Sequence, residues 1–455
     1  MKTYYILNIK TLDLEKRIKQ YPPDFKFNLD YAYWLISEVL IKTAYKLDMG
    51  EKNINIPMCS EILKGHPYSY RNHLRYLCEN FSGIGNVLWR SDYSKGKCYS
   101  YKIAPYYFSD EISFYEITDK RLTNFILKEL DIKSNNDFKK QYNFLGKYFN
   151  AERLKIDLRS CNEVLVTNYR LDSNRSKYLI NAINAIQIAN GEFNLRLSKN
   201  DGRVHTQITN LSKSFRPFLS YDGKKLGEVD ISASVPSFLY YILLNWSNTE
   251  DSHLSNVINP SKLYYRHYMF LKTLVELDNS ELSLFGEKIK SGEFYDCFIE
   301  GMHSVHSFDE RLHKDEYYLK NVERICNRPF DGDIEDLKAV IKNRFLSMLN
   351  AQPANYLNEE AEFNMHFPSI LNWIKNFKKI NHRYFSHLLL QTESYFMLDI
   401  VARKLNNDLK GKVPVFTLHD CIITTEENLE FVESFMKNTL TEALGFTPKM
   451  KSKVF

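Results

Sequence analysis

The sequence contains little glycine and proline and no long hydrophobic run. Its 455 residues include 16 glycines and 13 prolines, which excludes a collagen-like or low-complexity chain. No stretch approaches the roughly 20 apolar residues that a membrane-spanning helix requires. The first residues lack the apolar segment of a secretory signal peptide. We therefore expect a soluble, cytoplasmic protein with no membrane partner.

Cysteine is also scarce, and its seven positions are scattered. No Cys-x-x-Cys pair occurs and the number is odd, which argues against a disulfide framework or a zinc ribbon and favours a reducing compartment. The chain is 44% hydrophobic and 26% charged, the balance of a globular protein. Its length allows about two to four domains. A net charge of +5 is compatible with a nucleic-acid partner without requiring one.

The first 110 residues have the element order of a winged helix. Their apolar spacing and turn residues separate helical segments from alternating, strand-like ones. In order, the pattern predicts a helix over 31–47, a strand at 54–56, a helix opened by Pro57, a helix over 66–80, and a hairpin of strands at 86–90 and 98–103.

Basic side chains accumulate in this module. Arg71, Arg75 and Lys97 are expected to face DNA and to contact its phosphates, together with Arg90 and Lys95. A small accessory module with a solvated basic face has the same pattern, and winged helices also bind proteins. Residues 111–200 are predicted to be mainly helical.

A carboxylate marks the end of a predicted strand at 226–231. Asp230 is followed by small residues, by Pro236 and by a helix rich in Phe, Leu and Tyr. A rigid strand that ends before a helix is a common place for a metal ligand, although an N-cap or a turn would also place an Asp there.

A second carboxylate lies between two apolar segments near the end of the sequence. Residues 413–418 and 421–425 have the pattern of buried strands, so His419 and Asp420 are predicted to form the turn of a hairpin. Aspartate is routine in surface turns. The two apolar strands on either side nevertheless favour a carboxylate that is held in a fixed position for a function. Two carboxylates on separate strands suit a pair of Mg²⁺ ions, which prefer oxygen ligands and stabilise phosphoryl transfer.

A basic helix over 332–352 supplies the third part of this prediction. Asp333 is expected to cap its N-terminus. Lys338 and Lys342 lie four residues apart on one face, and Phe345 lies on nearly the same face. Such a stripe can hold the phosphates and the base of a nucleotide, although an exposed helix with solvated lysines has the same pattern.

Together these segments resemble the catalytic half of single-subunit RNA polymerases of phage and mitochondrial type and of family A DNA polymerases. VDISASVPSF, which contains Asp230, resembles motif A, and LHDCIIT, which contains Asp420, resembles motif C. Lys338, Lys342 and Asn350 fall at the spacing of motif B. The stretch DGRVHTQITNL, residues 201–211, resembles the segment before motif A that meets the template–primer hybrid.

The resemblance implies an α/β (α+β) fold of right-hand polymerase type. A palm would span 201–455, with fingers inserted at roughly 250–385. A helical linker or thumb-like arm would span 111–200, and the winged-helix-like module would span 1–110. The resemblance also implies a DNA template, with RNA possible, and dNTP or NTP substrates.

The same resemblance assigns roles to individual residues. Asp230 and Asp420 would hold two Mg²⁺ ions with the carbonyl of Ile231, and Lys342 would grip the triphosphate and protonate the leaving pyrophosphate. The residues expected to bind the nucleotide are Lys338, Lys342, Phe345, Asn350 and Val235. The residues expected to contact the primer or the template are Arg203, His205, His419 and Gln391.

Three departures from the polymerase motifs leave the choice of sugar open. Asn350 stands where a tyrosine normally ends motif B. Val235 stands where the related DNA polymerases carry a Glu that blocks a 2′-hydroxyl. Lys338 replaces an Arg, and the two are not equivalent at a phosphate.

Three functions therefore compete at this point. The leading interpretation is a template-directed polymerase that serves the replication or transcription of a mobile element or phage. A DNA-binding replication initiator or regulator with an inactive polymerase-like half would explain the altered motif B. A primase or template-independent nucleotidyltransferase is the third.

Overall fold

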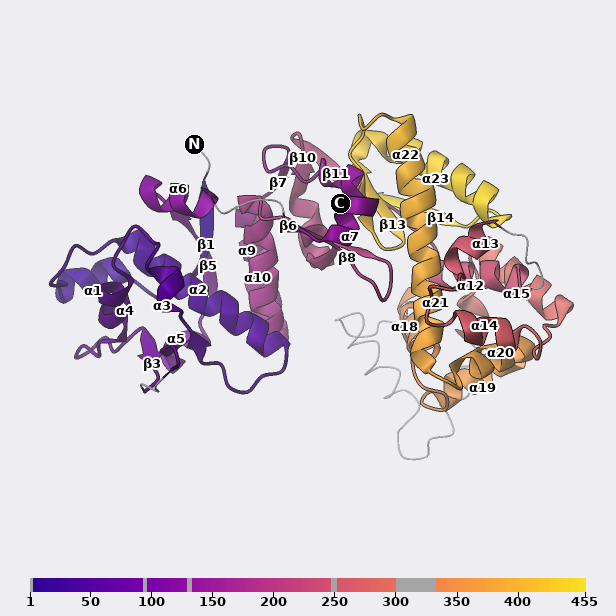
Figure 1. Ribbon diagram of the computed structural model, residues 1–455, viewed down its shortest axis with the longest axis horizontal. Helices are drawn as coiled ribbons and strands as arrows, with labels where there is room; N and C mark the ends of the chain where they lie inside the picture. The colour runs from indigo at the N-terminus through magenta and orange to yellow at the C-terminus, as the bar shows by residue number, and fades with distance from the viewer. Residues whose placement is uncertain (1–2, 93–95, 129–132, 247–251, 300–332) are drawn as a thin grey trace. The chain divides into compact units, whose positions relative to one another are not determined.

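A computed structural model of the chain has the expected mixture of helices and strands (Figure 1). The residues that it describes are 3–92, 96–128, 133–246, 252–299 and 333–455. The chain divides into two compact units. The first contains residues 1–196, 205–226 and 454–455, and the second contains residues 197–204 and 227–453.

The first unit begins with a strand that pairs far along the chain. β1 (Tyr4–Ile9) is antiparallel to β5 (Ile112–Ile117) over its whole length. The backbone N–H of Tyr5 donates to Asn190 Oδ1 (2.8 Å) at the end of α10 (Arg175–Asn190). The N-terminal segment is therefore anchored to residues beyond position 110.

The elements predicted for the winged-helix-like module occur in the predicted order. They are α2 (Leu29–Asp48), β2 (Ile56–Pro57), α3 (Ser60–Leu63), α4 (Tyr70–Cys78), β3 (Leu88–Arg90) and β4 (Ser100–Ile103). The strands form an antiparallel sheet in the order β2–β4–β3.

The expected role of Pro57 at the start of a helix is wrong. Pro57 ends strand β2 opposite Ser100, and the helix α3 begins at Ser60. A proline is tolerated here because β2 lies at the edge of its sheet. The backbone N–H that proline lacks is not needed there for hydrogen bonds to a second neighbouring strand.

The remainder of the first unit mixes helices with short strands. The long helices α9 (Leu158–Asp172) and α10 confirm the helical prediction in part. The other strands are β6 (Lys133–Ser134), β7 (Leu154–Ile156), β8 (Asn194–Leu197), β9 (Val204–His205) and β10 (Leu219–Tyr221). The shorter helices are α1 (Leu14–Gln20), α5 (Pro105–Phe108), α6 (Lys120–Lys128), α7 (Asn136–Gln141), α8 (Asn143–Gly146), α11 (Gln207–Asn210) and the 3₁₀ turn η1 (Lys213–Phe218).

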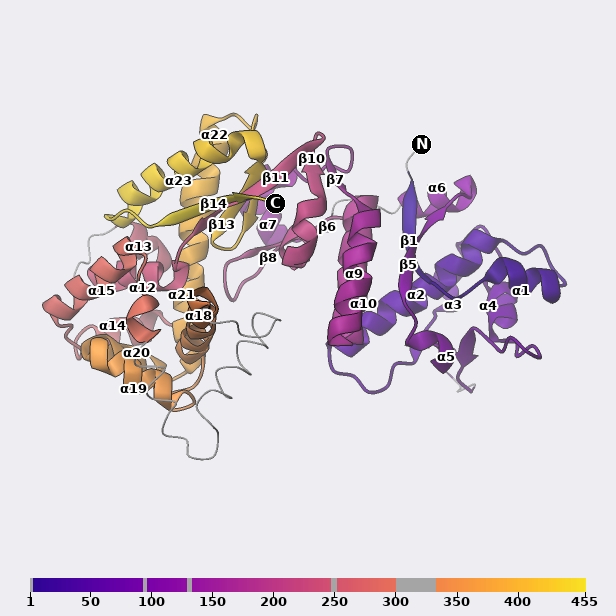
Figure 2. The ribbon, with the colours of Figure 1, turned by 180° about the vertical axis from the view of Figure 1, so that it is seen from behind.

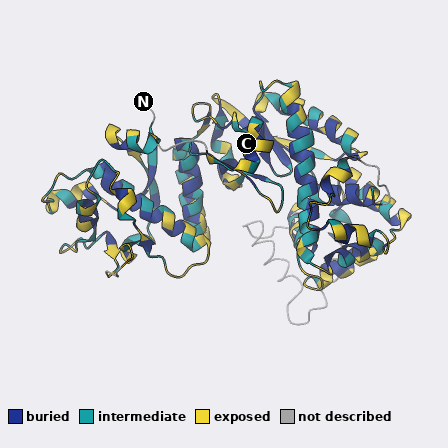
Figure 3. Ribbon diagram, in the orientation of Figure 1, coloured by how far each residue is buried: buried dark blue, intermediate teal, exposed yellow. Residues whose placement is uncertain are grey.

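Three neighbouring strands form the centre of the second unit. β11 (Lys224–Ile231) starts in the first unit, where its first residues pair with β10. In the second unit it lies beside β13 (Cys421–Thr425), which pairs with β12 (Phe416–Leu418). Every residue of β12 and β13 is buried, dark blue in Figure 3. β14 (Met450–Val454) also pairs with β11.

Helices surround these strands in the second unit. A long rod formed by α21 (His382–Ser394), the π-helical η4 (Tyr395–Ala402) and α22 (Arg403–Asp408) runs through it (Figures 1 and 2). The other helices among the described residues of this unit are α12 (Ser234–Leu244), α13 (Ser252–Val257), α14 (Tyr265–Leu271), α15 (Asn279–Ser291), η2 (Asp296–Phe298), α18 (Ile334–Asn350), α19 (Leu357–His366), α20 (Pro368–Lys378), η5 (Glu426–Asn428) and α23 (Leu429–Leu444).

Aromatic side chains dominate the core of this unit. The indole of Trp373 is fully buried and meets the ring of Trp246 edge-on at 5.1 Å. Phe238 stacks on Phe396 at 5.8 Å. Within the described part of the chain, no helix combines the length and the apolar composition needed to cross a membrane.

Candidate active site

Asp230 lies where the sequence predicted it, one residue before the end of strand β11. The backbone is fixed on both sides, because Val229 and Ile231 are buried and Ala233 turns the chain with a left-handed φ of +54° into α12. Val235 follows, half-buried, in the first turn of that helix. The carboxylate is half-buried, so it is held by a rigid strand and remains accessible.

The predicted hairpin around Asp420 is confirmed. Leu418 pairs with Cys421, so His419 and Asp420 form a two-residue turn between β12 and β13. His419 adopts a φ of +56°, a conformation that such hairpin turns require and that glycine usually supplies. Two buried strands therefore impose the backbone geometry that presents Asp420.

The fold brings these two acids together, and we call Asp230 and Asp420 the acid pair. β11 and β13 are neighbouring strands, and the backbone N–H of Ile231 donates to the carbonyl of Asp420 (3.3 Å). The hydroxyl of Ser234 donates to Asp420 Oδ2 (2.7 Å). The turn that carries Asp420 is thus tied to the strand and the helix on both sides of Asp230.

A third carboxylate, Glu393 on α21, lies within electrostatic reach of the acid pair. Its side chain is only 2% exposed, and Arg203 donates to its Oε1 from Nε (3.0 Å) and from Nη2 (2.6 Å). Burial raises the pKa of Glu393 to about 7, Arg203 opposes the shift, and the charges of Asp420 and Asp230 add to it. Arg203, predicted to meet nucleic acid, is therefore engaged with this acid.

The loop before Arg203 is fastened to the same helix. Gln391 Nε2 donates to the carbonyl of Asn200 (2.7 Å), and Ser394 Oγ donates to the carbonyl of Asp201 (3.0 Å). Gly202 has a φ of +71°, and a Cβ there would lie 3.4 Å from that of Ser394. Gln391 was predicted to contact nucleic acid, and its amide is used here to hold the loop. His205, also predicted, lies half-buried in β9 of the first unit.

Helix α18 carries Lys338 and Lys342, which we call the lysine pair. Asp333 caps the helix as predicted, accepting from the N–H of Glu335 (2.9 Å). Lys338 forms ion pairs with Asp296 (2.8 Å) and with Glu335 (2.9 Å), and these partners raise its pKa. Lys342 is exposed, and no ion pair joins it to a residue that the structure describes.

The other predicted residues of α18 have different surroundings. The ring of Phe345 is 1% exposed and packs on Phe298 at a centroid distance of 4.2 Å, so it belongs to the core. Asn350 is exposed at the end of the helix, where its Nδ2 donates to the carbonyl of Leu346 (2.8 Å). Phe345 is therefore inaccessible to a nucleotide, whereas Asn350 is accessible.

A short segment that the sequence did not point to lies between the acid pair and α18. The hydroxyl of Tyr295 is buried with no hydrogen-bond partner among the described residues. Burial raises its pKa, and the charge of Asp420 adds to the shift, so this hydroxyl lies near that carboxylate. The next residue, Asp296, is the ion-pair partner of Lys338. No local pattern marks this segment, because its position depends on long-range packing.

The acid pair is not part of a larger cluster of metal-ligating side chains in the described part of the chain. Among the described residues, no three side chains of His, Cys, Asp or Glu come close enough together to hold an ion. The hydroxyl of Ser232, two residues after Asp230, is buried with no hydrogen-bond partner in the described part of the chain. An ion bound here would need backbone carbonyls or a substrate to complete its ligands.

Of the basic residues predicted in the first unit, Arg71 and Arg75 lie on α4, Arg90 ends β3 and Lys97 precedes β4, whereas Lys95 lies outside the described residues. Arg75 pairs with Asp24 (2.7 Å), Arg71 donates to the hydroxyl of Tyr70 (3.1 Å), and Lys97 is exposed. A cavity of about 460 Å³ on this module is lined by Arg75, Cys78, Glu79, Asn86, Trp89 and Arg90.

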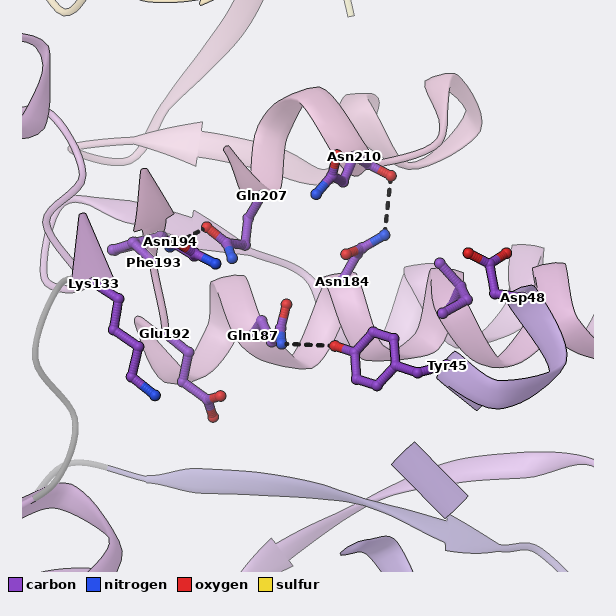
Figure 4. A pocket seen from close by; sticks show the side chains of 11 residues that line it. Tyr45, Asp48, Lys133, Asn184, Gln187, Glu192, Phe193, Asn194, Gln207 and Asn210 are labelled. Atoms are coloured by element: carbon purple, nitrogen blue, oxygen red, sulfur yellow. Dashed lines mark hydrogen bonds between the residues drawn. The ribbon is translucent and has the colours of Figure 1, made fainter. Parts of the chain in front are cut away.

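A second cavity in the first unit, of about 540 Å³, has a polar lining rich in amides (Figure 4). Asn184 Nδ2 donates to the carbonyl of Asn210 (2.9 Å), and Gln207 Oε1 accepts from the N–H of Asn194 (2.7 Å). These bonds hold the lining in place. Gln207 and Asn210, which belong to the predicted hybrid-contacting stretch 201–211, are among the residues that line this cavity.

Comparison with known proteins gives a structural neighbour and no sequence relative. No protein-family model matches the chain, and no curated protein matches it. A solved structure, the POL domain of Pol1 from M. smegmatis in complex with DNA primer-template and dNTP, is similar with a TM-score of 0.31 and 10% identity. The match covers 64% of this chain and 54% of that one, so the chain spans about half the length of its structural neighbour.

Proposed function

We propose that the chain is a template-directed nucleic-acid polymerase, a nucleotidyltransferase of right-hand type. The observation that carries the proposal is the acid pair: Asp230 lies near the end of β11, Asp420 lies in the turn before the neighbouring strand β13, and the N–H of Ile231 donates to the carbonyl of Asp420 (3.3 Å). Their sequence surroundings resemble motifs A and C. A sheet that fixes the backbone of two carboxylate residues on neighbouring elements suits two-metal phosphoryl transfer.

The donor atoms fit Mg²⁺. The acid pair offers carboxylate oxygens, the ligands that this ion prefers, and Mg²⁺ commonly completes its shell with water and substrate phosphates. The carbonyl of Ile231 is the proposed backbone ligand. When bound, two ions would neutralise charge on the attacking and leaving oxygens. The hydrogen bond from Ser234 (2.7 Å) would keep the Asp420 carboxylate in one orientation.

The lysine pair would have unequal roles. Lys342 is exposed, so it is available to bind the triphosphate and to donate a proton to the leaving pyrophosphate. Lys338 is already neutralised by Asp296 and Glu335 and would contribute less. Val235 and Asn350 would lie near the sugar of the incoming nucleotide, and His419 near the primer end.

The first unit would supply DNA binding through its winged-helix-like module. Arg71, Arg75 and Lys97 would contact phosphates, which makes binding salt-dependent. Replacing all three by Ala in the full chain should weaken duplex binding and reduce the slope of log K against log salt by about 0.9 per lost contact. The control is a double variant, Lys139→Ala with Lys140→Ala, which removes two exposed lysines of α7. An unchanged slope in the triple variant would favour protein docking by this module.

A DNA-binding module before a polymerase fits a protein that replicates or transcribes a mobile element or phage.

One observation favours a second candidate, a DNA-binding initiator or regulator whose polymerase-like half is inactive. Lys338 is engaged by two carboxylates, and Phe345 is buried in the core, so α18 offers less to a nucleotide than its sequence predicted. The acid pair weighs against this candidate, because an inactive site has no need of two fixed carboxylates.

An incorporation assay separates the candidates. The full chain is incubated with Mg²⁺ and either dNTPs or NTPs, on a primed template, on an unprimed template and without template. We expect extension of the primed template, and none by Asp230→Ala. Synthesis without a primer would instead indicate a primase, and synthesis without a template would indicate a template-independent transferase. No incorporation in any mixture, with DNA binding intact, would support the inactive candidate.

A further inference from the structure

Two cysteines of the first unit lie opposite each other at the edge of the small sheet. Ile56 faces Tyr101 and Pro57 faces Ser100, and the N–H of Met58 donates to the carbonyl of Tyr99 (3.1 Å). Cys59 and Cys98 lie just beyond the two strands, and this register, continued by one residue past the Met58–Tyr99 bond, places them opposite each other. Hydrogen-bonded and non-hydrogen-bonded pairs alternate between antiparallel strands, so Cys59 and Cys98 occupy a non-hydrogen-bonded position.

That position is suited to a disulfide. Residues in a non-hydrogen-bonded pair have Cα atoms about 4.5 Å apart with their side chains close together, and disulfides span Cα distances of roughly 4.4–6.8 Å. Both cysteines are free thiols in the structure, and the Cys98 side chain helps to lower the pKa of the Cys59 thiol, so the two side chains lie near each other. The backbone can therefore accept a cross-link without moving far.

The accessibility and the thiol pKa values of these cysteines also favour a disulfide between them. Cys98 is exposed and Cys59 is partly exposed. The backbone N–H groups of Ile62 and Glu61, with a smaller contribution from Cys98, lower the pKa of the Cys59 thiol. Burial instead raises the pKa of Cys78, in the same module, to about 11. Thiolates are the reactive species, so Cys59 is the expected nucleophile and Cys78 is a natural control.

We propose that Cys59 and Cys98 are an oxidation site that closes into a reversible disulfide when the protein meets a peroxide. The Cys59 thiolate attacks one peroxide oxygen, which forms a sulfenic acid and releases the other oxygen as water after protonation. The Cys98 sulfur then displaces a second water and forms the S–S bond. In total, two thiols and one hydrogen peroxide give one disulfide and two waters, and a dithiol reductant reverses the change.

The cross-link would join the residue before α3 to the end of the β3–β4 hairpin, beside Lys97. Fixing Lys97 against α3 restricts the positions that it can take at a phosphate, so we expect weaker DNA binding in the oxidised protein. This consequence rests on the proposed DNA binding, whereas formation of the disulfide does not.

The experiment uses the full chain before and after hydrogen peroxide, followed by blocking of free thiols and non-reducing peptide mapping by mass spectrometry. We expect a linked Cys59–Cys98 peptide in wild type and in Cys78→Ser, its loss in Cys98→Ser, and its disappearance after dithiothreitol. Failure to find the link in wild type, or an equal yield of another cysteine pair, would overturn the proposal.

The same samples then test the consequence. Binding of a labelled DNA duplex at fixed salt should weaken at least threefold on oxidation of wild type and of Cys78→Ser, and should not change for Cys98→Ser. If the linked peptide forms but affinity stays constant, the regulatory part is wrong and the oxidation site stands. If neither redox form binds DNA, the proposed DNA binding fails, and peptide mapping still decides the oxidation site.

Discussion

The acid pair and the lysine pair belong to the same unit but are held in different ways. Asp230 lies on β11, and Asp420 lies in the turn between the buried strands β12 and β13. Hydrogen bonds from the N–H of Ile231 and the hydroxyl of Ser234 tie that turn to the residues after Asp230. The lysine pair lies on the accessible side of α18, where Lys338 is ion-paired with Asp296 and Glu335 and Lys342 is exposed. The position of the acids is set by the fold, whereas that of the lysines depends on what binds them.

This difference predicts how each group responds to mutation. Side chains that a rigid scaffold holds in place stabilise a transition state most, because no free energy is spent on orienting them during the reaction. Long flexible side chains must be ordered first. Loss of the acid pair should therefore lower the catalytic rate strongly, whereas loss of the lysine pair should lower it only moderately.

The largest effect is expected from loss of either acid. Asp230→Ala or Asp420→Ala should lower the rate of nucleotide incorporation at least about a thousandfold, roughly 4 kcal/mol of barrier, because each removes oxygen ligands from a shared Mg²⁺ pair. Asp408→Ala, an exposed acid of α22, is the matched control and should retain activity. Single-turnover primer extension measures the rates, and substantial activity in either acid variant would remove the assignment.

The burial of Glu393, with a smaller contribution from the charges of the acid pair, should also be visible in stability. The pKa of Glu393 is raised from 4.5 to about 7. The unfolded chain therefore releases this proton near pH 4.5, while the folded protein holds it until about pH 7. The free energy of unfolding should consequently fall as pH rises between these values, by about 3 kcal/mol at most.

Glu393→Gln removes this titrating group and should flatten that part of the profile. Urea unfolding of both proteins at several pH values provides the comparison. The opposite result is a wild-type free energy of unfolding that rises with pH while that of the Gln variant stays flat. It would mean that the effect of Arg203 on the pKa of Glu393 is larger than the combined effect of burial and the two acids.

A smaller effect is expected from the lysine pair. Lys342→Ala should slow incorporation about thirtyfold, roughly 2 kcal/mol, because it removes a charge placed to meet the leaving group. Lys338→Ala should cost less than about fivefold, since Asp296 and Glu335 already neutralise that charge. Equal, small losses in both would indicate that α18 is only a solvated helix.

The smallest effect concerns the choice of sugar. Val235 and Asn350 provide no carboxylate barrier, so ribonucleotides should be incorporated within about a hundredfold of deoxynucleotides, a gap of roughly 2.7 kcal/mol. Val235→Glu should increase discrimination against ribonucleotides about tenfold. Incorporation of matched dNTP and NTP opposite one template base tests both statements. A wild-type preference far beyond that range would place the sugar filter in another residue.

The parts of the site that were predictable from sequence are those encoded by local patterns. Apolar runs around His419 and Asp420 specified the hairpin, and Asp333 specified the start of α18, because strand pairing across a two-residue turn and helix capping are local effects. Pro57 was assigned wrongly because its pairing with Ser100 is a contact distant in sequence. Glu393 and Tyr295 depend on the packing of helices far apart in the chain, which periodicity does not reveal.

The most direct test of the central claim, that Asp230 and Asp420 act as one site, is a double-mutant cycle in single-turnover primer extension. If the two carboxylates hold the same Mg²⁺ pair, either Ala substitution disables the site, and the double variant should be no slower than the slower single variant within about threefold. If the losses of the single variants multiply instead, the two acids act independently and the account is contradicted.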